Sequence, residues 1–158
     1  LTCPIYLAAL GREAAFGDMV KPFVLKNIVD TNNFSSIIST GSQGNEIIAS
    51  IPENLRQNLL DGMNGVASNL GVSVPQGYTL YAKTGTAETW LGDFLYITGC
   101  VKNSNDTGSA TYETYENYGN SGSYIIVLQV QNPDYHGFKF ASESARLYQG
   151  IVDIAVGN

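Results

Sequence analysis

The chain is 158 residues long, a length typical of one domain, and 44% of its residues are apolar whereas 14% are charged. That composition excludes wholesale disorder and allows a sizeable core. The net charge of −6, with eight Lys and Arg residues, argues against nucleic acid or an anionic membrane surface as a partner, because both attract basic patches.

The two cysteines, Cys3 and Cys100, are far apart in the sequence, and the chain has a single histidine. So few soft ligands argue against a zinc site, and we expect neither a metal nor another cofactor. We expect both cysteines to be buried and reduced rather than joined in a disulfide. The first residues include no initiator Met and no signal-peptide pattern, and no apolar run is long enough to span a bilayer. We therefore expect the sequence to come from within a longer protein.

The beginning of the chain predicts one helix and one strand. Thr2 as a cap, Pro4 in the first turn and apolar residues at helical spacing predict a helix over residues 2–16. A strand is expected over residues 20–29, with its proline near the beginning. The polar residues 31–49 predict a loop or an irregular hairpin.

A second helix has the clearest start signal, because the Ser50 hydroxyl and the Glu53 carboxylate have the spacing of a capping box. This helix is predicted over residues 50–70 and is expected to pack through one continuous apolar stripe. The stripe consists of Leu55, Leu59, Met63, Val66 and Leu70.

The second half predicts three strands and a final helix, over residues 78–88, 94–101, 124–131 and 142–156. The short link between the first two strands favours antiparallel pairing. Residues 103–123 are polar and predict a long, mobile surface loop. The core-facing residues of the last helix are expected to be Leu147, Ile151 and Ile154. The pattern predicts an α+β fold over residues 1–158, with an antiparallel sheet, packed helices and no second domain.

The residues that indicate chemistry are Lys83, Thr84, Gly85 and Thr86, on the first of these strands. A strand alternates its side chains, so Thr84 and Thr86 share one face and Lys83 points to the other. A Lys-Thr-Gly triplet alone is a weak signal, because a solvated lysine among β-favouring threonines explains it more simply.

A longer match changes that interpretation. Residues 81–88, Tyr-Ala-Lys-Thr-Gly-Thr-Ala-Glu, resemble the third conserved motif of the penicillin-binding proteins and serine β-lactamases. Residues 55–69 are similar to the helix that precedes this strand in transpeptidases, and residues 2–8 and 17–22 resemble an upstream helix and its exit. The chain therefore resembles the C-terminal half of a penicillin-binding transpeptidase domain, in the right order along nearly its whole length.

Two other family motifs are absent. The family requires Ser-x-x-Lys, which supplies the nucleophilic serine, and Ser-x-Asn, which relays protons and holds the substrate amide; in family order both lie before residue 1. Local sequences such as 142–145 and 35–38 lack the lysine, and Ser104-Asn105 lies in the polar loop, so none replaces them. We expect the chain alone to be inactive.

The resemblance implies a role for each residue of the strand. The Thr84 and Thr86 hydroxyls would bind the terminal carboxylate of a D-alanyl-D-alanine stem peptide or of a β-lactam. Lys83 would add positive potential and bond the relay serine, and Gly85 would let the nucleophile's helix approach. The Thr86 N–H would be one of two oxyanion donors, and the strand edge would pair with the peptide.

For four further residues a structural role competes with a functional one. Glu88 is interpreted as a solvated strand-end carboxylate rather than a catalytic one. Trp90 either lines the rim of the cleft or caps a sheet edge. His136 is interpreted as a solvated loop residue, and Asp134 beside it makes no triad without a serine.

The resemblance implies that the longer protein cross-links peptidoglycan through an acyl-serine intermediate and is inhibited by β-lactams. It would be membrane-anchored, act outside the cytoplasmic membrane and, from Ala87-Glu88, belong to the monofunctional class. A further pair of strands and a helical subdomain would complete its fold, and the isolated chain is expected to self-associate. The alternatives are a serine β-lactamase or a β-lactam sensor of the same fold, or a non-catalytic module that binds cell-wall peptide or protein partners.

Overall fold

A computed structural model of the chain describes residues 3–22, 27–29, 36–39, 46–90, 92–106 and 122–157; for residues 27–29, 36–39, 135 and 136 it describes the backbone alone. The interior of the predicted loop 103–123 lies outside the described residues. No described helix combines the length and hydropathy needed to cross a membrane.

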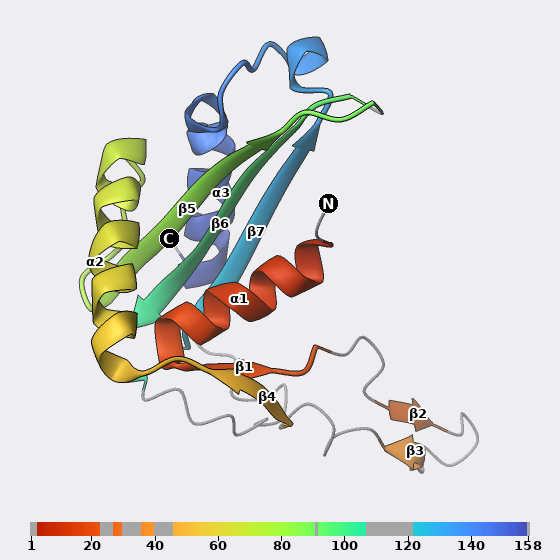
Figure 1. Cartoon of the computed structure of the whole chain (residues 1–158), viewed down its shortest axis with the longest axis vertical. Helices are drawn as coiled ribbons and strands as arrows, with labels where there is room; N and C mark the ends of the chain where they lie inside the picture. The colour runs from red at the N-terminus through yellow and green to blue at the C-terminus, as the bar shows by residue number, and fades with distance from the viewer. Residues whose placement is uncertain are drawn as a thin grey trace.

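The fold is α+β, as predicted, and the strand that contains residues 83–86 lies in the largest sheet (Figure 1). The helices are α1 (Pro4–Phe16), α2 (Glu53–Leu70) and α3 (Ala145–Val156), with 3₁₀ turns η3 (Pro133–His136) and η4 (Ala141–Ser144) before α3. The strands are β1 (Asp18–Val20), β2 (Asn27–Val29), β3 (Ser36–Ser39), β4 (Ile47–Ser50), β5 (Tyr78–Ala87), β6 (Phe94–Asn103) and β7 (Tyr124–Gln131).

The main sheet is antiparallel in the order β5-β6-β7, and β1-β4 and β2-β3 form two small antiparallel pairs. The helices α1 and α3 lie on opposite faces of this sheet, and α2 lies beside β5 (Figure 1). Among the described strands β5 has β6 as its sole neighbour, so its outer edge is unpaired. β5 therefore lies at one side of the sheet, and its outer edge pairs with none of the described strands.

One face of the sheet packs against α3. Tyr148 and Val152 of α3 are 0% exposed and share a cluster with residues of all three strands. The Tyr148 hydroxyl donates to the Ile126 carbonyl at 3.4 Å, and burial raises the pKa of this hydroxyl above its usual range. The strand residues of the cluster are Leu80, Ala82, Leu95, Ile97, Val101 and Ile126. Their alternation along each strand leaves the intervening residues on the α1 face.

The C-terminal end of α1 is held by cations from two other elements. The Ala15 carbonyl accepts hydrogen bonds from Arg56 of α2 at 2.9 Å and from Lys102 of β6 at 3.1 Å. Glu53 accepts from the same Arg56 guanidinium at 2.5 and 2.7 Å, which lowers the pKa of Glu53. Cations at the carbonyl end of a helix are stabilised by its dipole. These contacts fix α1 against both α2 and the sheet.

The strand predicted over residues 20–29 is wrong as one continuous element. The Lys21 N–H donates to the Glu46 carbonyl at 2.8 Å, but Pro22 has no N–H with which to extend that ladder, and β1 ends at Val20. Residues 27–29 form β2 in a different sheet. The segment 31–49 contains β3 and most of β4, which pair with β2 and β1 in separate sheets and not with each other, so neither a loop nor a hairpin describes it.

The predicted helix starts also need correction. Thr2 lies outside the described residues, and Cys3 stands at the N-cap of α1 without a side-chain cap bond. Ser50 is the last residue of β4, and Pro52 stands at the N-cap of α2, so no capping box forms there. The Glu53 carboxylate is engaged by Arg56 instead, because a charged partner makes the stronger hydrogen bond.

The predicted packing face of α2 is correct in part, and that of α3 is wrong. On α2 Met63 is buried and Val66 and Leu70 pack against the core, as predicted. Leu55 and Leu59 are instead 57% and 45% exposed, and Leu60 and Ala67 are also buried. In α3 the predicted core residues are exposed, and Tyr148, Val152 and Val156 are buried. These three buried residues form a second apolar row on α3. Burial of the large Tyr148 ring with its hydroxyl bonded is more favourable than burial of the aliphatic side chains of the predicted row. The exposed residues are Leu147, Ile151 and Ile154.

The cysteines are both free, but only Cys100 is buried, so the expected burial of Cys3 is wrong. Burial raises the pKa of the Cys100 thiol to about 12. An unfolded cysteine titrates near pH 8.5. The protonated thiol therefore adds stability that is complete below about pH 8.5 and is lost as the pH rises towards 12, because the unfolded chain releases its proton first.

We expect a thiol reagent at pH 8 to modify Cys3 quickly in the folded chain and Cys100 only after denaturation. The measurement is a count of labelled thiols before and after addition of guanidinium. The Cys100→Ser variant, which lacks the slow thiol, is the control. Rapid labelling of both thiols in the folded chain would contradict the burial of Cys100.

Gly99 of β6 lies where the sheet meets α3. A Cβ there would stand 2.5 Å from both the Tyr148 hydroxyl and the Tyr81 carbonyl oxygen. We expect Gly99→Ala to lower the free energy of unfolding by about 1–3 kcal/mol, because a rigid backbone atom must move. The matched control is Gly62→Ala in α2, where a Cβ meets nothing within 4 Å and better helix propensity adds up to about 1 kcal/mol. Urea unfolding of both variants measures the difference, and an unaffected Gly99 variant would contradict the close contact.

Candidate active site

The Lys-Thr-Gly-Thr residues lie near the end of β5, on its unpaired edge. They are held in register by β6, where Thr84 faces Ile97, Gly85 faces Tyr96 and Thr86 faces Leu95. Lys83, Gly85 and Thr86 are exposed and Thr84 is half-buried, so all four remain accessible from outside the sheet. The paired inner edge fixes the backbone, while the outer edge offers its polar groups to another chain.

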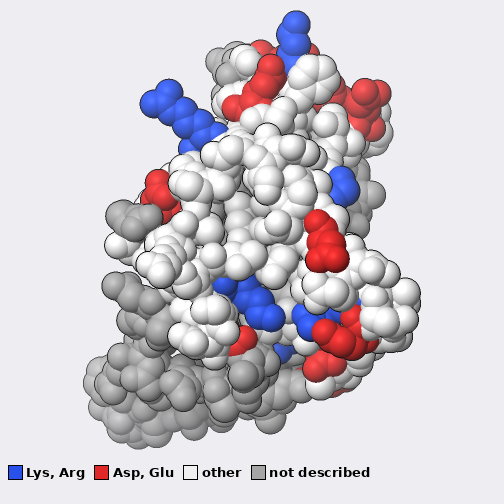
Figure 2. Space-filling model, turned by 90° about the vertical axis from the view of Figure 1, so that its left-hand side faces the viewer, with Lys and Arg blue, Asp and Glu red and all other residues white. Residues whose placement is uncertain are grey.

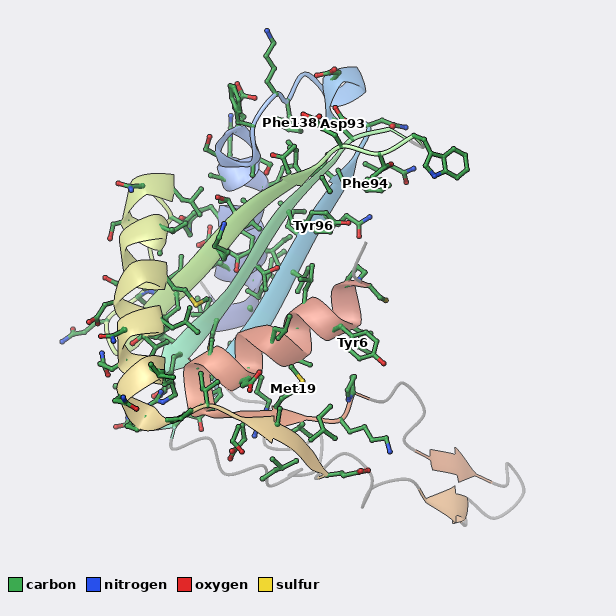
Figure 3. All side chains as sticks on the ribbon, in the orientation of Figure 1. Tyr6, Met19, Asp93, Phe94, Tyr96 and Phe138 are labelled. Atoms are coloured by element: carbon green, nitrogen blue, oxygen red, sulfur yellow. The ribbon has the colours of Figure 1, made fainter. Side chains whose placement is uncertain are left out.

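An apolar cavity of about 420 Å³ lies between this strand, α1 and α2. Its sheet residues are Lys83, Thr84, Gly85, Ala87, Tyr96 and Thr98; its other residues are Leu7, Leu10, Gly11, Glu13, Ala14, Ile51, Leu59 and Met63. Lys83, Gly85 and Ala87 alternate along β5 and share the α1 face, as the predicted alternation requires. Tyr96 stands on β6 midway along the sheet (Figure 3). The active-site candidates therefore border a hollow, not a filled core.

The Lys83 ammonium donates to the carbonyl of its neighbour Thr84. No carboxylate of the described residues pairs with it, so its charge is available to a ligand at the strand edge. On the face of the molecule that carries α2, charged side chains of both signs are scattered and no basic patch forms (Figure 2). Lys83 thus places a positive charge on the cavity side of β5, bonded to the Thr84 carbonyl at the site of the motif.

Glu13 is a feature of the site that the sequence prediction missed. This α1 residue is only 9% exposed overall and lines the cavity. No described side-chain oxygen or nitrogen is both buried and without a hydrogen-bond partner, so the Glu13 carboxylate is accessible from the cavity. The signal available in the sequence was a charged residue on the otherwise apolar side of helix 2–16.

The remaining candidates do not join the strand. Trp90 follows β5 and is 91% exposed, so the alternative in which it caps a sheet edge is wrong. Glu88 and Asp134 are exposed, and the side chain of His136 lies outside the described residues. Within the described residues no group of three or more His, Cys, Asp and Glu side chains could hold a metal ion.

An α+β domain in which a Lys-Thr-Gly-Thr edge strand borders an apolar cavity is thus the unit that carries the candidate site. The model of the penicillin binding protein transpeptidase domain matches residues 4–148, and the chain belongs to this family. The family is one of acyltransferase or peptidase-like enzymes. A comparison with curated proteins found no match.

We expect Glu13→Gln to change the free energy of unfolding of the chain by less than about 0.5 kcal/mol, because the carboxylate is accessible from the cavity and no described polar side-chain atom is buried without a partner. The matched control is Glu88→Gln, an exposed carboxylate whose replacement is expected to have an equally small effect. Thermal unfolding of both variants at pH 7 measures the difference. A clear stabilisation in the Glu13 variant alone would show instead that the fold buries this charge without a partner.

Proposed function

We propose that the intact protein is a penicillin-binding D,D-transpeptidase that cross-links peptidoglycan through an acyl-serine intermediate. The observation that carries the proposal is the open edge of β5, where the polar groups of Lys83, Thr84 and Thr86 are accessible beside a cavity. Family membership supports the reaction class. The substrate would be a stem peptide ending in D-alanyl-D-alanine, and a β-lactam would occupy the same position.

The recognition step uses the end of the peptide. The Thr84 and Thr86 hydroxyls, on one face of β5, donate to the terminal carboxylate, and the Lys83 ammonium adds a charge of the opposite sign. The peptide backbone pairs with the free strand edge, which orients the scissile carbonyl without further side chains. This arrangement selects a free C-terminus over the middle of a peptide.

The covalent step needs a serine that the chain does not supply. The serine oxygen forms a bond to the scissile carbonyl carbon, its proton passes to a base, and the terminal D-alanine leaves with a proton on its nitrogen. During attack the Thr86 N–H would donate to the developing oxyanion. An acceptor amine then displaces the serine and forms the cross-link.

The cavity supports a proposal for where the nucleophilic serine lies. Gly85 lines it, and a Cβ at Gly85 would meet nothing within 4 Å, so a helix could approach the strand closely there. We propose that the segment with Ser-x-x-Lys fills this space in the intact protein and that Ser-x-Asn adjoins it. The chain would then be the C-terminal part of the domain, and the whole protein would be anchored in the membrane and act on its outer side.

In the intact protein we expect Thr84→Val to slow acylation by penicillin roughly tenfold to a few hundredfold. The change preserves shape but removes a hydrogen bond to a charged group, worth about 1.5–3 kcal/mol. Lys83→Ala is expected to be at least as damaging. Stopped-flow acylation with a fluorescent penicillin measures both.

The matched control is Thr79→Val, an exposed threonine on the same strand but nearer its start, which is expected to leave the rate unchanged. The 158-residue chain alone is expected to form no covalent adduct, as intact mass would show. Wild-type rates in the Thr84 and Lys83 variants, or a stoichiometric adduct on the chain alone, would refute the assignment of this site.

A further inference from the structure

Trp90 is the single tryptophan of the chain and its most exposed large apolar side chain among those described, at 91%. It lies in the connection between β5 and β6, directly beyond the strand that carries Lys83 and Thr84. This connection projects past the end of the sheet at the upper right of Figure 1. A large aromatic ring in such a position makes little contribution to the core.

Hydrogen bonds join the residues on either side of Trp90 to each other and to the end of β7. The Gly92 N–H donates to the Thr89 carbonyl at 3.1 Å, and the Thr89 hydroxyl donates to the Gly92 carbonyl at 2.7 Å. Gly92 has φ +108°, and a Cβ there would overlap the side-chain oxygen of Asn132, which follows β7. The Asn132 N–H also donates to the Asp93 carbonyl at 2.8 Å. Backbone bonds on both sides therefore hold the turn while its tryptophan remains in solvent.

The proposed function sets the direction of the substrate along β5. If the terminal carboxylate lies at Thr84 and the scissile carbonyl lies at the Thr86 N–H, the peptide runs antiparallel to the strand. Its residues upstream of the scissile bond then extend from Thr86 towards Trp90. β5 itself ends at Ala87, and the connection carries the chain on to Trp90. Four residues span at most about 13 Å when extended, a distance that three or four residues of an extended peptide also cover.

We propose that Trp90 is a specificity-determining residue that packs against the aliphatic side chains of the stem peptide upstream of the scissile bond. This inference rests on the proposed function. An indole face offers a large apolar surface at small conformational cost, and its N–H can still bond to the peptide backbone or to water. Trp90 would contribute nothing to binding of the terminal D-alanines or of a small β-lactam, neither of which reaches the turn.

The test compares two substrates in the intact protein. One is a thioester peptide with the complete upstream sequence, and the other is an acetylated thioester limited to the residues at the scissile bond. For Trp90→Ala we expect kcat/KM to fall about tenfold with the long substrate, mainly through KM. We expect no change with the short substrate or in acylation by penicillin, and Trp90→Phe is expected to recover most of the loss. Tyr6→Ala is the control, since Tyr6 is 53% exposed but lies on α1, away from Asp93 at the base of the turn (Figure 3).

A second measurement uses the 158-residue chain, where all tryptophan fluorescence comes from Trp90. The long peptide, as a stable amide, is expected to shift that emission to shorter wavelength, and the short one is not. An equal loss with both substrates in Trp90→Ala, or no loss with either, would overturn the role of Trp90. Failure of the wild-type protein to react with either substrate or with penicillin would instead overturn the proposed function.

Discussion

Ten consecutive residue pairs join β5 to β6, and the site depends on this uninterrupted register. Because the inner edge of β5 is paired along its whole length, the backbone at Thr84 and Thr86 is fixed before any ligand arrives. The outer edge of the same strand pairs with no other described strand, although Asn64 of α2 donates to the Leu80 carbonyl at 3.3 Å nearer the start of the strand. A strand that is rigid on one side and open on the other can bind an extended peptide at little cost in conformational entropy.

The position of α1 determines what lies beside that strand. Arg56 and Lys102 converge on the Ala15 carbonyl, so the end of α1 is tied to α2 and to β6 at one point. The helix then crosses the sheet with Gly11 close enough to Ile125 that a Cβ would lie 3.2 Å from it. The cavity lies between α1, α2 and β5. Glu13 lines this otherwise apolar cavity and is accessible from it, so the cavity offers a carboxylate as well as apolar side chains to any group that enters.

The strands of the sheet and the C-terminal ends of the helices could be predicted from the sequence, but the helix starts and most of the packing faces could not. The strand predicted over residues 124–131 coincides with β7, and that over 78–88 exceeds β5 by one residue, because runs of β-branched and aromatic residues are a local property. The predicted capping box did not form because Ser50 pairs with Asp18 of β1, a tertiary partner, and because Arg56, one turn further along α2, binds the Glu53 carboxylate. The Lys-Thr-Gly-Thr strand was predicted from a motif, whereas the burial of Glu13 depends on the neighbours of α1 and was not.

The exposed apolar surfaces of α3 and β7 are the places where further protein would pack on this unit. The α3 helix is apolar on two sides, with Tyr148 inside and Ile154 83% exposed, as in helices that lie between two layers. The eight residues of β7 include no charge and no proline, although edge strands are usually protected by one or the other. Together with the cavity beside β5, these surfaces support the proposal that further segments of the same domain pack on both faces of the sheet. The same surfaces explain why the chain by itself is expected to self-associate, since water would otherwise cover an apolar strand edge and an apolar helix face.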